Sequence, residues 1–197
     1  MKHLLFLEGN IQIGKSTIIL DNLRSNMIIE HTGGFLCQRL TENDKTRAFR
    51  LIEAEKAETS DIKYKVNTPS VFLEEVSGKW IKRDEVFLTK GIEFLSDLSS
   101  RKLILLDEIG GFELLIDGFR EKLYEVLLDN IPIIGVIKSV INSAIMKNTV
   151  KIDDDYYAKY EELRSVITNI GGKIVKVNNN NIVSVSDEIK SFLGNIR

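Results

Sequence analysis

Residues 9–17 read G-N-I-Q-I-G-K-S-T and match the complete phosphate-binding pattern G-x-x-x-x-G-K-[ST], known as the P-loop. The motif follows an apolar run at residues 4–7 and precedes residues 16–24, which can wind as a helix. A strand, a glycine-rich loop and a helix in this order form the context that distinguishes a working P-loop from a coincidence. The chain is therefore expected to begin with a buried strand and to bind phosphate where that strand ends.

This loop has a specific chemistry. Its glycines let the backbone approach phosphate closely, and the helix that follows adds the positive end of its dipole. In this pattern Lys15 reaches the β- and γ-phosphates and the Ser16 hydroxyl binds Mg²⁺. The expected ligand is a nucleoside triphosphate such as ATP or GTP, with Mg²⁺ as the cofactor. The candidate nucleotide-binding residues are Gly9, Asn10, Ile11, Gln12, Ile13, Gly14, Lys15, Ser16 and Thr17.

A second motif supplies two carboxylates. Residues 103–106 are a continuous apolar run, typical of a strand buried on both faces, and Asp107 and Glu108 follow directly. We expect this strand to lie beside the first one, because ligands of such sheets bind outside the carboxyl ends of the strands. Asp107 is then expected to lie near Ser16 and to complete the Mg²⁺ site. Glu108 is predicted to be a general base or a water-orienting group, which indicates a hydrolase.

The rest of the chain falls into two parts with different sequence patterns. Residues 34–82 form short segments separated by polar turns, including residues 41–45 and Gly78, and this spacing is typical of antiparallel hairpins. From Asp84, which is expected to cap a helix, strands alternate with helices. This rhythm predicts an α/β fold with a doubly wound, mostly parallel sheet and an antiparallel hairpin extension. We expect a single P-loop NTPase domain over residues 1–197, with the antiparallel insertion at about residues 34–82. The expected elements are helices at residues 84–98, 117–129, 155–169 and 187–193, and strands at residues 131–137 and 173–177.

Composition excludes several classes of function. The formal net charge is −2 and the sequence pI about 5.8, so the chain lacks the basic footprint that nucleic acid or an anionic membrane requires. No apolar run approaches the roughly 20 residues that span a bilayer. Two histidines and one cysteine, scattered along the chain, give no metal-ligand spacing. Cys37 has no partner for an internal disulfide, so a cytoplasmic location is expected. The sequence identifies no protein partner.

These motifs resemble those of a family of small P-loop nucleoside-triphosphatases, first described in thermophiles, which includes the human cancer-related NTPase. The resemblance covers roughly residues 2–195, and its two phosphate-site motifs are the specific part. It implies a fold similar to P-loop kinases and slow hydrolysis of ATP, GTP and other nucleoside triphosphates to the diphosphate. It also implies that Lys15 and Ser16 bind phosphate and Mg²⁺, that Asp107 completes the metal site and that Glu108 is the catalytic carboxylate. The resemblance is carried by residues 9–17, Gly34, Phe35, residues 107–110, Glu113, Phe119 and Arg120.

The chain departs from the family pattern at three places. Residues 11–12 read I-Q where family P-loops usually carry a proline and an additional glycine. Residues 111–112 read G-F where the family often has lysine and methionine after the acidic strand. The family also tends to show Thr-His-Arg after the next strand, where residues 137–139 read I-K-S. Lys138 is therefore expected to supply the charge of that arginine without its planar fork.

Charge that develops on a transferred phosphoryl group requires a cation besides Lys15 and Mg²⁺. Lys138, at the end of a predicted strand, is the first candidate for a catalytic cation, and Arg39, Arg47 and Arg120 are the alternatives.

The aromatic residues that either stack on the base or belong to the core are Trp80, Phe112, Tyr156 and Tyr157.

Three functions fit these motifs. The first is an Mg²⁺-dependent nucleoside-triphosphatase that cleaves the β–γ bond. The second is a nucleotide or small-molecule kinase, in which Glu108 accepts the proton of a substrate hydroxyl; residues 139–155 hold only Lys147 and Lys151 as cations and lack an arginine-rich lid. The third is a weakly catalytic, nucleotide-dependent adaptor that uses residues 34–82 as its contact surface.

Overall fold

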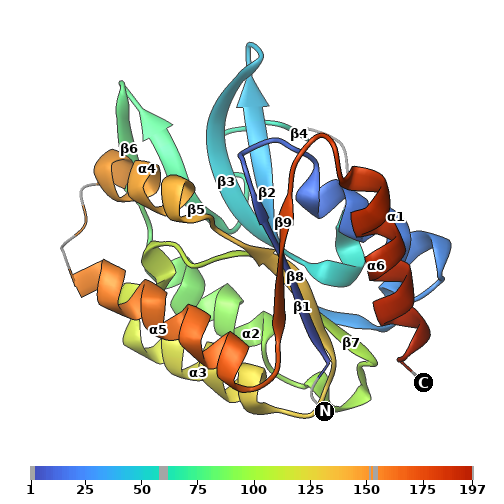
Figure 1. Ribbon diagram of the computed structural model, residues 1–197. Helices are drawn as coiled ribbons and strands as arrows, with labels where there is room; N and C mark the ends of the chain where they lie inside the picture. Colours follow the sequence, from blue (N-terminus) through green and yellow to red (C-terminus); the bar gives the residue numbers. More distant parts are fainter. Residues whose placement is uncertain (1–2, 58–61, 151, 153–154, 197) are drawn as a thin grey trace.

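A computed structural model of the protein describes residues 3–57, 62–150, 152 and 155–196, and within these residues nine strands form one sheet (Figure 1). The strand order is β6-β5-β3-β2-β7-β8-β1-β9, and the short strand β4 pairs with β2. The expected α/β fold, with a mostly parallel sheet and an antiparallel part, is confirmed. The strands are β1 (Leu4–Gly9), β2 (Thr32–Glu42), β3 (Lys45–Glu53), β4 (Ile62–Lys63), β5 (Val71–Val76), β6 (Lys79–Lys82), β7 (Leu103–Ile109), β8 (Ile133–Ile137) and β9 (Lys173–Val177).

The parallel half of the sheet contains the strands that end at the phosphate-binding motifs. Strand β1 pairs in parallel with β8 and β9, and β7 pairs in parallel with β8 and β2. The expectation that the acidic strand lies beside β1 is wrong, because β8 lies between β7 and β1. The strand that separates them includes Gly135, where a Cβ atom would lie 2.0 Å from the Leu106 carbonyl oxygen. A glycine there permits a close approach of the two backbones.

The antiparallel half is built from two hairpins, as the turn residues of 34–82 predict. Strands β2 and β3 are joined at Asn43 and Asp44, both with positive φ, and β5 and β6 are joined at Ser77 and Gly78, also with positive φ. Two central residues of positive φ are the mark of the hairpin turn whose twist matches the strands it joins. Residues 58–61 of the expected insertion lie outside the described part.

Helices cover both faces of the sheet (Figure 1). Helices α1 and α6 pack on one face, and α2, α3 and α5 lie on the other. Each face buries a separate hydrophobic cluster, and the β7 and β8 side chains that alternate between the clusters are almost fully buried. The helices are α1 (Lys15–Ser25), α2 (Ile92–Phe94), α3 (Asp117–Leu128), α4 (Val140–Val150), α5 (Asp155–Asn169) and α6 (Ile182–Gly194), with 3-10 turns η1 (Ile29–His31), η2 (Ala54–Lys56), η4 (Leu98–Ser100) and η5 (Phe112–Leu115) and a π-helical turn η3 (Phe87–Gly91).

Several predicted boundaries differ from the structure. The helix expected at residues 84–98 is instead the π-helical turn η3 followed by the short α2, which ends at Phe94. Asp84 does not cap it through its side chain: Oδ2 accepts a hydrogen bond from Lys82, and Oδ1 has no partner among the described residues. The last helix starts at Ile182 rather than residue 187, and α4 was not predicted at all.

Candidate active site

The P-loop connects β1 to α1 and is shaped by two residues with positive φ, Gln12 at 63° and Gly14 at 90°. Lys15 begins the helix, and its side chain turns back across the loop. Its Nζ donates hydrogen bonds to the carbonyl oxygens of Gly9 at 3.2 Å and Asn10 at 2.8 Å. The lysine is only 4% exposed, so its charge is held at the centre of the loop.

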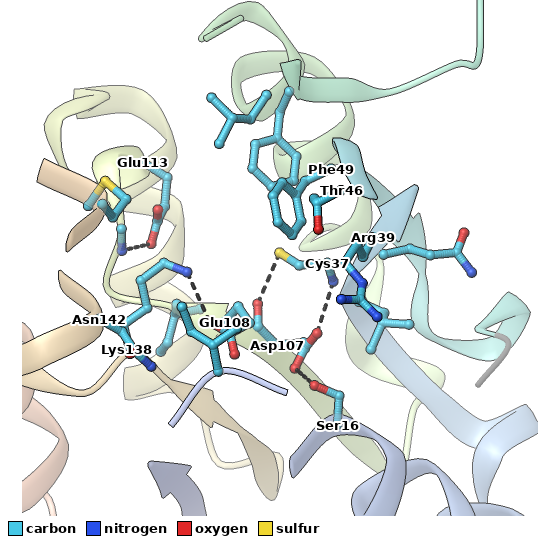
Figure 2. Close-up of a pocket in the computed structure, with 18 of the residues that line it drawn as sticks. Ser16, Cys37, Arg39, Thr46, Phe49, Asp107, Glu108, Glu113, Lys138 and Asn142 are labelled. Carbon is cyan, nitrogen blue, oxygen red and sulfur yellow. Dashed lines mark hydrogen bonds and ion pairs between the residues drawn. The ribbon is translucent and has the colours of Figure 1, made fainter. Parts of the chain in front are cut away.

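Asp107 lies within hydrogen-bonding distance of the P-loop helix, as the sequence predicts, although β8 separates their strands. The Ser16 Oγ donates a hydrogen bond of 2.7 Å to Asp107 Oδ1, and the main-chain N–H of Cys37 donates to Oδ2 at 3.1 Å. Burial raises the pKa of Asp107 to about 7, and the neighbouring charge of Glu108 adds to this rise. A fully buried carboxylate with two neutral donors thus lies beside the Ser16 hydroxyl (Figure 2).

Glu108 has a backbone conformation that a non-glycine residue rarely adopts, with φ at 56°. The parallel register of β7 and β8 shifts between Leu106 and Ile109, so Glu108 lies in an irregularity of the strand. Such irregularities re-aim a side chain and occur next to active sites. Here the Glu108 carboxylate turns toward two lysines: Lys138 Nζ lies 2.9 Å from Oε2, and Lys15 Nζ lies 3.7 Å from Oε1.

The two lysines fix the ionisation of Glu108. Burial alone pushes the pKa of its carboxyl upward, but the charges of Lys138 and Lys15 outweigh burial and the pKa is lowered. The Glu108 side chain remains 27% exposed. Glu108 is therefore an ionised and accessible carboxylate at the edge of the P-loop.

A set of buried hydrogen bonds holds the turn after Glu108. Glu113 Oε1 accepts from the main-chain N–H groups of Gly110 at 2.7 Å and Gly111 at 2.8 Å. The Tyr156 hydroxyl donates to the Gly110 carbonyl oxygen at 2.6 Å, and the Tyr160 hydroxyl donates to that of Lys138 at 2.6 Å. None of these contacts was predicted from the sequence; the two tyrosine contacts join helix α5 to the strand ends.

Helix α4 also contributes a residue that sequence reasoning missed. Asn142 Nδ2 donates a hydrogen bond of 2.9 Å to the carbonyl oxygen of Gly9, which also accepts from Lys15. Asn142 is 7% exposed, and an asparagine inside an apolar segment is the only local signal of its role. Helix α4 is thereby tied to the first residue of the P-loop.

The structure separates the candidate cations. Lys138 and Arg39 line the same cavity as Lys15. Arg47 instead forms ion pairs with two glutamates of the hairpins, and Arg120 pairs with Asp117 and donates to the Leu114 carbonyl oxygen. Neither of these two arginines lines the cavity, so the geometry favours Lys138, with Arg39 second.

Two of the four aromatic residues that were candidates for stacking on the base line the cavity. Trp80 and Phe112 line the cavity, whereas Tyr156 lies in the core and Tyr157 is 41% exposed outside it. The cavity has a volume of about 590 Å³ and extends from the P-loop past Asp107 and Glu108 to the antiparallel strands. Figure 2 shows Glu113, Lys138 and Asn142 on one side of it and Cys37, Arg39 and Phe49 on the other.

The residues present fit an Mg²⁺ ion. Ser16 and Asp107 offer a hydroxyl and a carboxylate oxygen, which are the hard ligands that Mg²⁺ prefers. The hydrogen-bond donors that reach Asp107 are neutral and burial raises its pKa, so a bound cation would stabilise its ionised form. The described residues contain no cluster of three or more His, Cys, Asp or Glu side chains that would form an all-protein metal cage. Mg²⁺ characteristically binds through one or two protein ligands together with substrate phosphates and water.

Comparison with known protein families shows to which family the chain belongs. A family described as NTPase matches residues 4–189, which is nearly the whole chain. The chain belongs to this NTPase family. The family consists of nucleoside-triphosphatases, as the resemblance of the P-loop and the acidic strand implies.

Curated NTPase relatives match over most of their length. The nucleoside-triphosphatase THEP1 of Thermotoga maritima is 25% identical over 190 residues, which cover 96% of this chain and 94% of the relative. The THEP1 of Saccharolobus solfataricus is 26% identical over 171 residues, which cover 84% of this chain and 93% of the relative.

Solved structures show the same fold. The crystal structure of THEP1 from Aquifex aeolicus has a TM-score of 0.63 at 19% identity and covers 98% of this chain and 99% of its own. The solution structure of a human cancer-related nucleoside triphosphatase has a TM-score of 0.65 at 18% identity, and the match covers both chains fully.

Among the described helices, none is long and apolar enough to cross a membrane.

Proposed function

We propose that the protein is an Mg²⁺-dependent nucleoside-triphosphatase that cleaves the β–γ bond of ATP, GTP and other nucleoside triphosphates. The products are the nucleoside diphosphate and inorganic phosphate. The observation that carries this proposal is the meeting of the P-loop and the acidic pair, with Ser16 Oγ 2.7 Å from Asp107 and Lys15 Nζ 3.7 Å from Glu108. Family membership supports the substrate class.

The P-loop residues 9–17 bind the phosphates in this proposal. Lys15 exchanges its contacts with the Gly9 and Asn10 carbonyl oxygens for the β- and γ-phosphate oxygens. Ser16 and Asp107 would hold the Mg²⁺ ion. When bound, Mg²⁺ neutralises charge that develops on the phosphate oxygens during transfer.

Glu108 is the catalytic carboxylate of the proposal. It accepts the proton of the attacking water or orients that water toward the γ-phosphate. Its lowered pKa keeps it ionised at neutral pH. Lys138, 2.9 Å from Glu108, supplies positive charge beside the transferred group in addition to Lys15.

We also infer that the whole chain of 197 residues acts as one domain in the cytoplasm and needs neither nucleic acid nor a membrane for activity. The continuous sheet across both halves and the free thiol of Cys37 support this inference.

Phosphate release from ATP, GTP, CTP and UTP tests the proposal, measured by a colorimetric phosphate assay with and without Mg²⁺. We expect release from all four nucleotides, its loss on chelation and recovery when Mg²⁺ is restored, and one phosphate released for each diphosphate formed. Lys15→Ala should abolish release, because Lys15 holds the phosphates. Undetectable release from every nucleotide by the folded protein, or release that Lys15→Ala leaves intact, would contradict the proposal. Diphosphate formed in excess of phosphate would indicate transfer to an acceptor other than water.

A further inference from the structure

The cavity beside the P-loop is also lined by residues far from the phosphate-binding motifs. Its far end, which we call the aromatic chamber, is lined by side chains that hydrolysis does not use. The lining residues of the aromatic chamber are Phe49, Phe72, Trp80, Phe87, Phe112, Ile145, Met146 and Val150.

The aromatic side of this chamber is a continuous wall. Phe49 lies between Trp80, at a ring-centroid distance of 6.1 Å, and Phe72, at 6.4 Å. Phe72 and Phe87 then each contact Phe112, at 6.1 Å and 5.6 Å. The rings are thus fixed by one another, while Phe49 and Trp80 remain partly exposed at the cavity.

Helix α4 forms the opposite side. Ile145, Met146 and Val150 line the cavity, and Asn142 ties the first turns of the helix to the Gly9 carbonyl oxygen. The chamber therefore lies between the antiparallel strands and a helix that is anchored at the P-loop, and it opens to solvent beside Ile145. Apolar walls of this kind favour an apolar molecule over water.

The position of the chamber sets it apart from the nucleotide. The inference rests on the proposed function for the direction of the triphosphate, whose γ-phosphate end lies at Lys15, Asp107 and Glu108. The chamber continues beyond Glu108, on the side away from the P-loop (Figure 2). The base of the same nucleotide lies at the other end of the triphosphate, so the proposal places it outside the chamber.

We propose that the aromatic chamber binds a second, flat aromatic molecule next to the γ-phosphate end of the nucleotide site. Aromatic rings in a wall of this kind accept another ring in stacked or edge-to-face contact. Binding pockets for small molecules are mainly apolar and place a few polar groups at one end, as Glu108 and Lys138 do here. Nucleotide and aromatic molecule occupy the cavity together.

Trp80 makes the test direct, because it is the one tryptophan of the sequence and lines the chamber. The folded full-length protein is titrated with 2-naphthol, a two-ring molecule, while the indole fluorescence of Trp80 is recorded. We expect saturable quenching, with an affinity that changes by less than about twofold when a non-hydrolysable ATP analogue saturates the P-loop.

Two variants of α4 form a matched pair. Ile145 is 51% exposed and lines the cavity, whereas Ile141 is 66% exposed, one turn earlier, and does not line it. Ile145→Glu should weaken 2-naphthol binding by about tenfold or more, since it brings a carboxylate to an apolar ligand. Ile141→Glu should leave the affinity unchanged, and circular dichroism checks that both variants are folded.

Three results would overturn the proposal. Quenching that does not saturate shows that the chamber holds no such molecule. Displacement of 2-naphthol by the ATP analogue shows that the nucleotide itself fills the chamber. Equal weakening by Ile145→Glu and Ile141→Glu places the binding elsewhere. Because binding is measured without turnover, these results do not depend on whether phosphate is released.

Discussion

The carboxylate of Glu108 lies between two lysines, with Lys138 Nζ 2.9 Å from one oxygen and Lys15 Nζ 3.7 Å from the other. Lys15 belongs to the P-loop, and Lys138 follows β8, the strand between β1 and β7. The strand between the two phosphate-site motifs thus brings a cation to the carboxylate of Glu108. The same arrangement lowers the pKa of Glu108 and gathers positive charge beside its carboxylate.

Lys138→Ala is predicted to change both the rate and its pH dependence. The loss of a positive charge beside the transferred group should lower kcat by about 10²-fold. Lys138 lowers the pKa of Glu108, so its removal raises that pKa and moves the acid limb of the kcat/KM profile to higher pH. The pH–rate profiles of the two proteins measure this shift. Lys122→Ala, which removes a surface lysine paired with Glu125, is the control and should change neither quantity.

Glu113→Ala is predicted to destabilise the fold. It leaves the N–H groups of Gly110 and Gly111 without their shared acceptor in a buried turn. Each unsatisfied group costs about 1–3 kcal/mol, so the free energy of unfolding should fall by about 2–5 kcal/mol in a denaturant titration. Glu113→Gln keeps an acceptor oxygen, so its free energy of unfolding should fall by clearly less. Equal losses in both variants would mean that the carboxylate charge, rather than the acceptor, holds the turn.

Glu74 provides a pH-dependent contribution to stability in the antiparallel half. A hydrogen bond from Tyr64, then one from Arg83, lowers the pKa of this buried carboxyl below its unfolded value. A lowered folded pKa stabilises the native state above the unfolded value of about 4.5, and this stabilisation is lost as the pH falls through the folded pKa. Glu74→Gln should therefore cost about 1–3 kcal/mol near pH 7 and progressively less below pH 4.5. Denaturant titrations across this range measure the difference, and a difference independent of pH would contradict it.

The parts of the fold that follow from local pattern were predictable from the sequence. The P-loop residues and the acid pair are contiguous motifs, and Asn43, Asp44 and Gly78 in the two hairpin turns are residue types that accept positive φ. The order of the strands was not predictable in the same way, because pairing joins residues that are distant in sequence. Strand β8 therefore appeared between β1 and β7, although the expected contact of Ser16 with Asp107 still formed.

Helix α4 was missed because its sequence, V-I-N-S-A-I-M-K-N-T-V, is rich in β-branched and polar residues of low helix propensity. Tertiary contacts stabilise it, including the bond from Asn142 to the Gly9 carbonyl oxygen. The role of Asn142 was missed for a related reason, since it depends on a carbonyl group 133 residues away that only the folded chain brings within reach. The role of Glu113 is local, but it depends on the conformation of the turn at Gly110 and Gly111. The sequence pattern located the candidate phosphate-site residues. The contacts that hold these residues in place were found only in the structure.

Single-turnover phosphate release by Glu108→Gln tests the central claim most directly. Glutamine keeps the size of the side chain but cannot take a proton, so release at saturating ATP and Mg²⁺ should fall by about 10²–10⁴-fold. ATP affinity should change by less than about threefold, because the P-loop holds the phosphates. The control Glu85→Gln alters an exposed glutamate outside the cavity and should release phosphate at the wild-type rate. Release by Glu108→Gln at the wild-type rate would show that Glu108 is not the catalytic carboxylate.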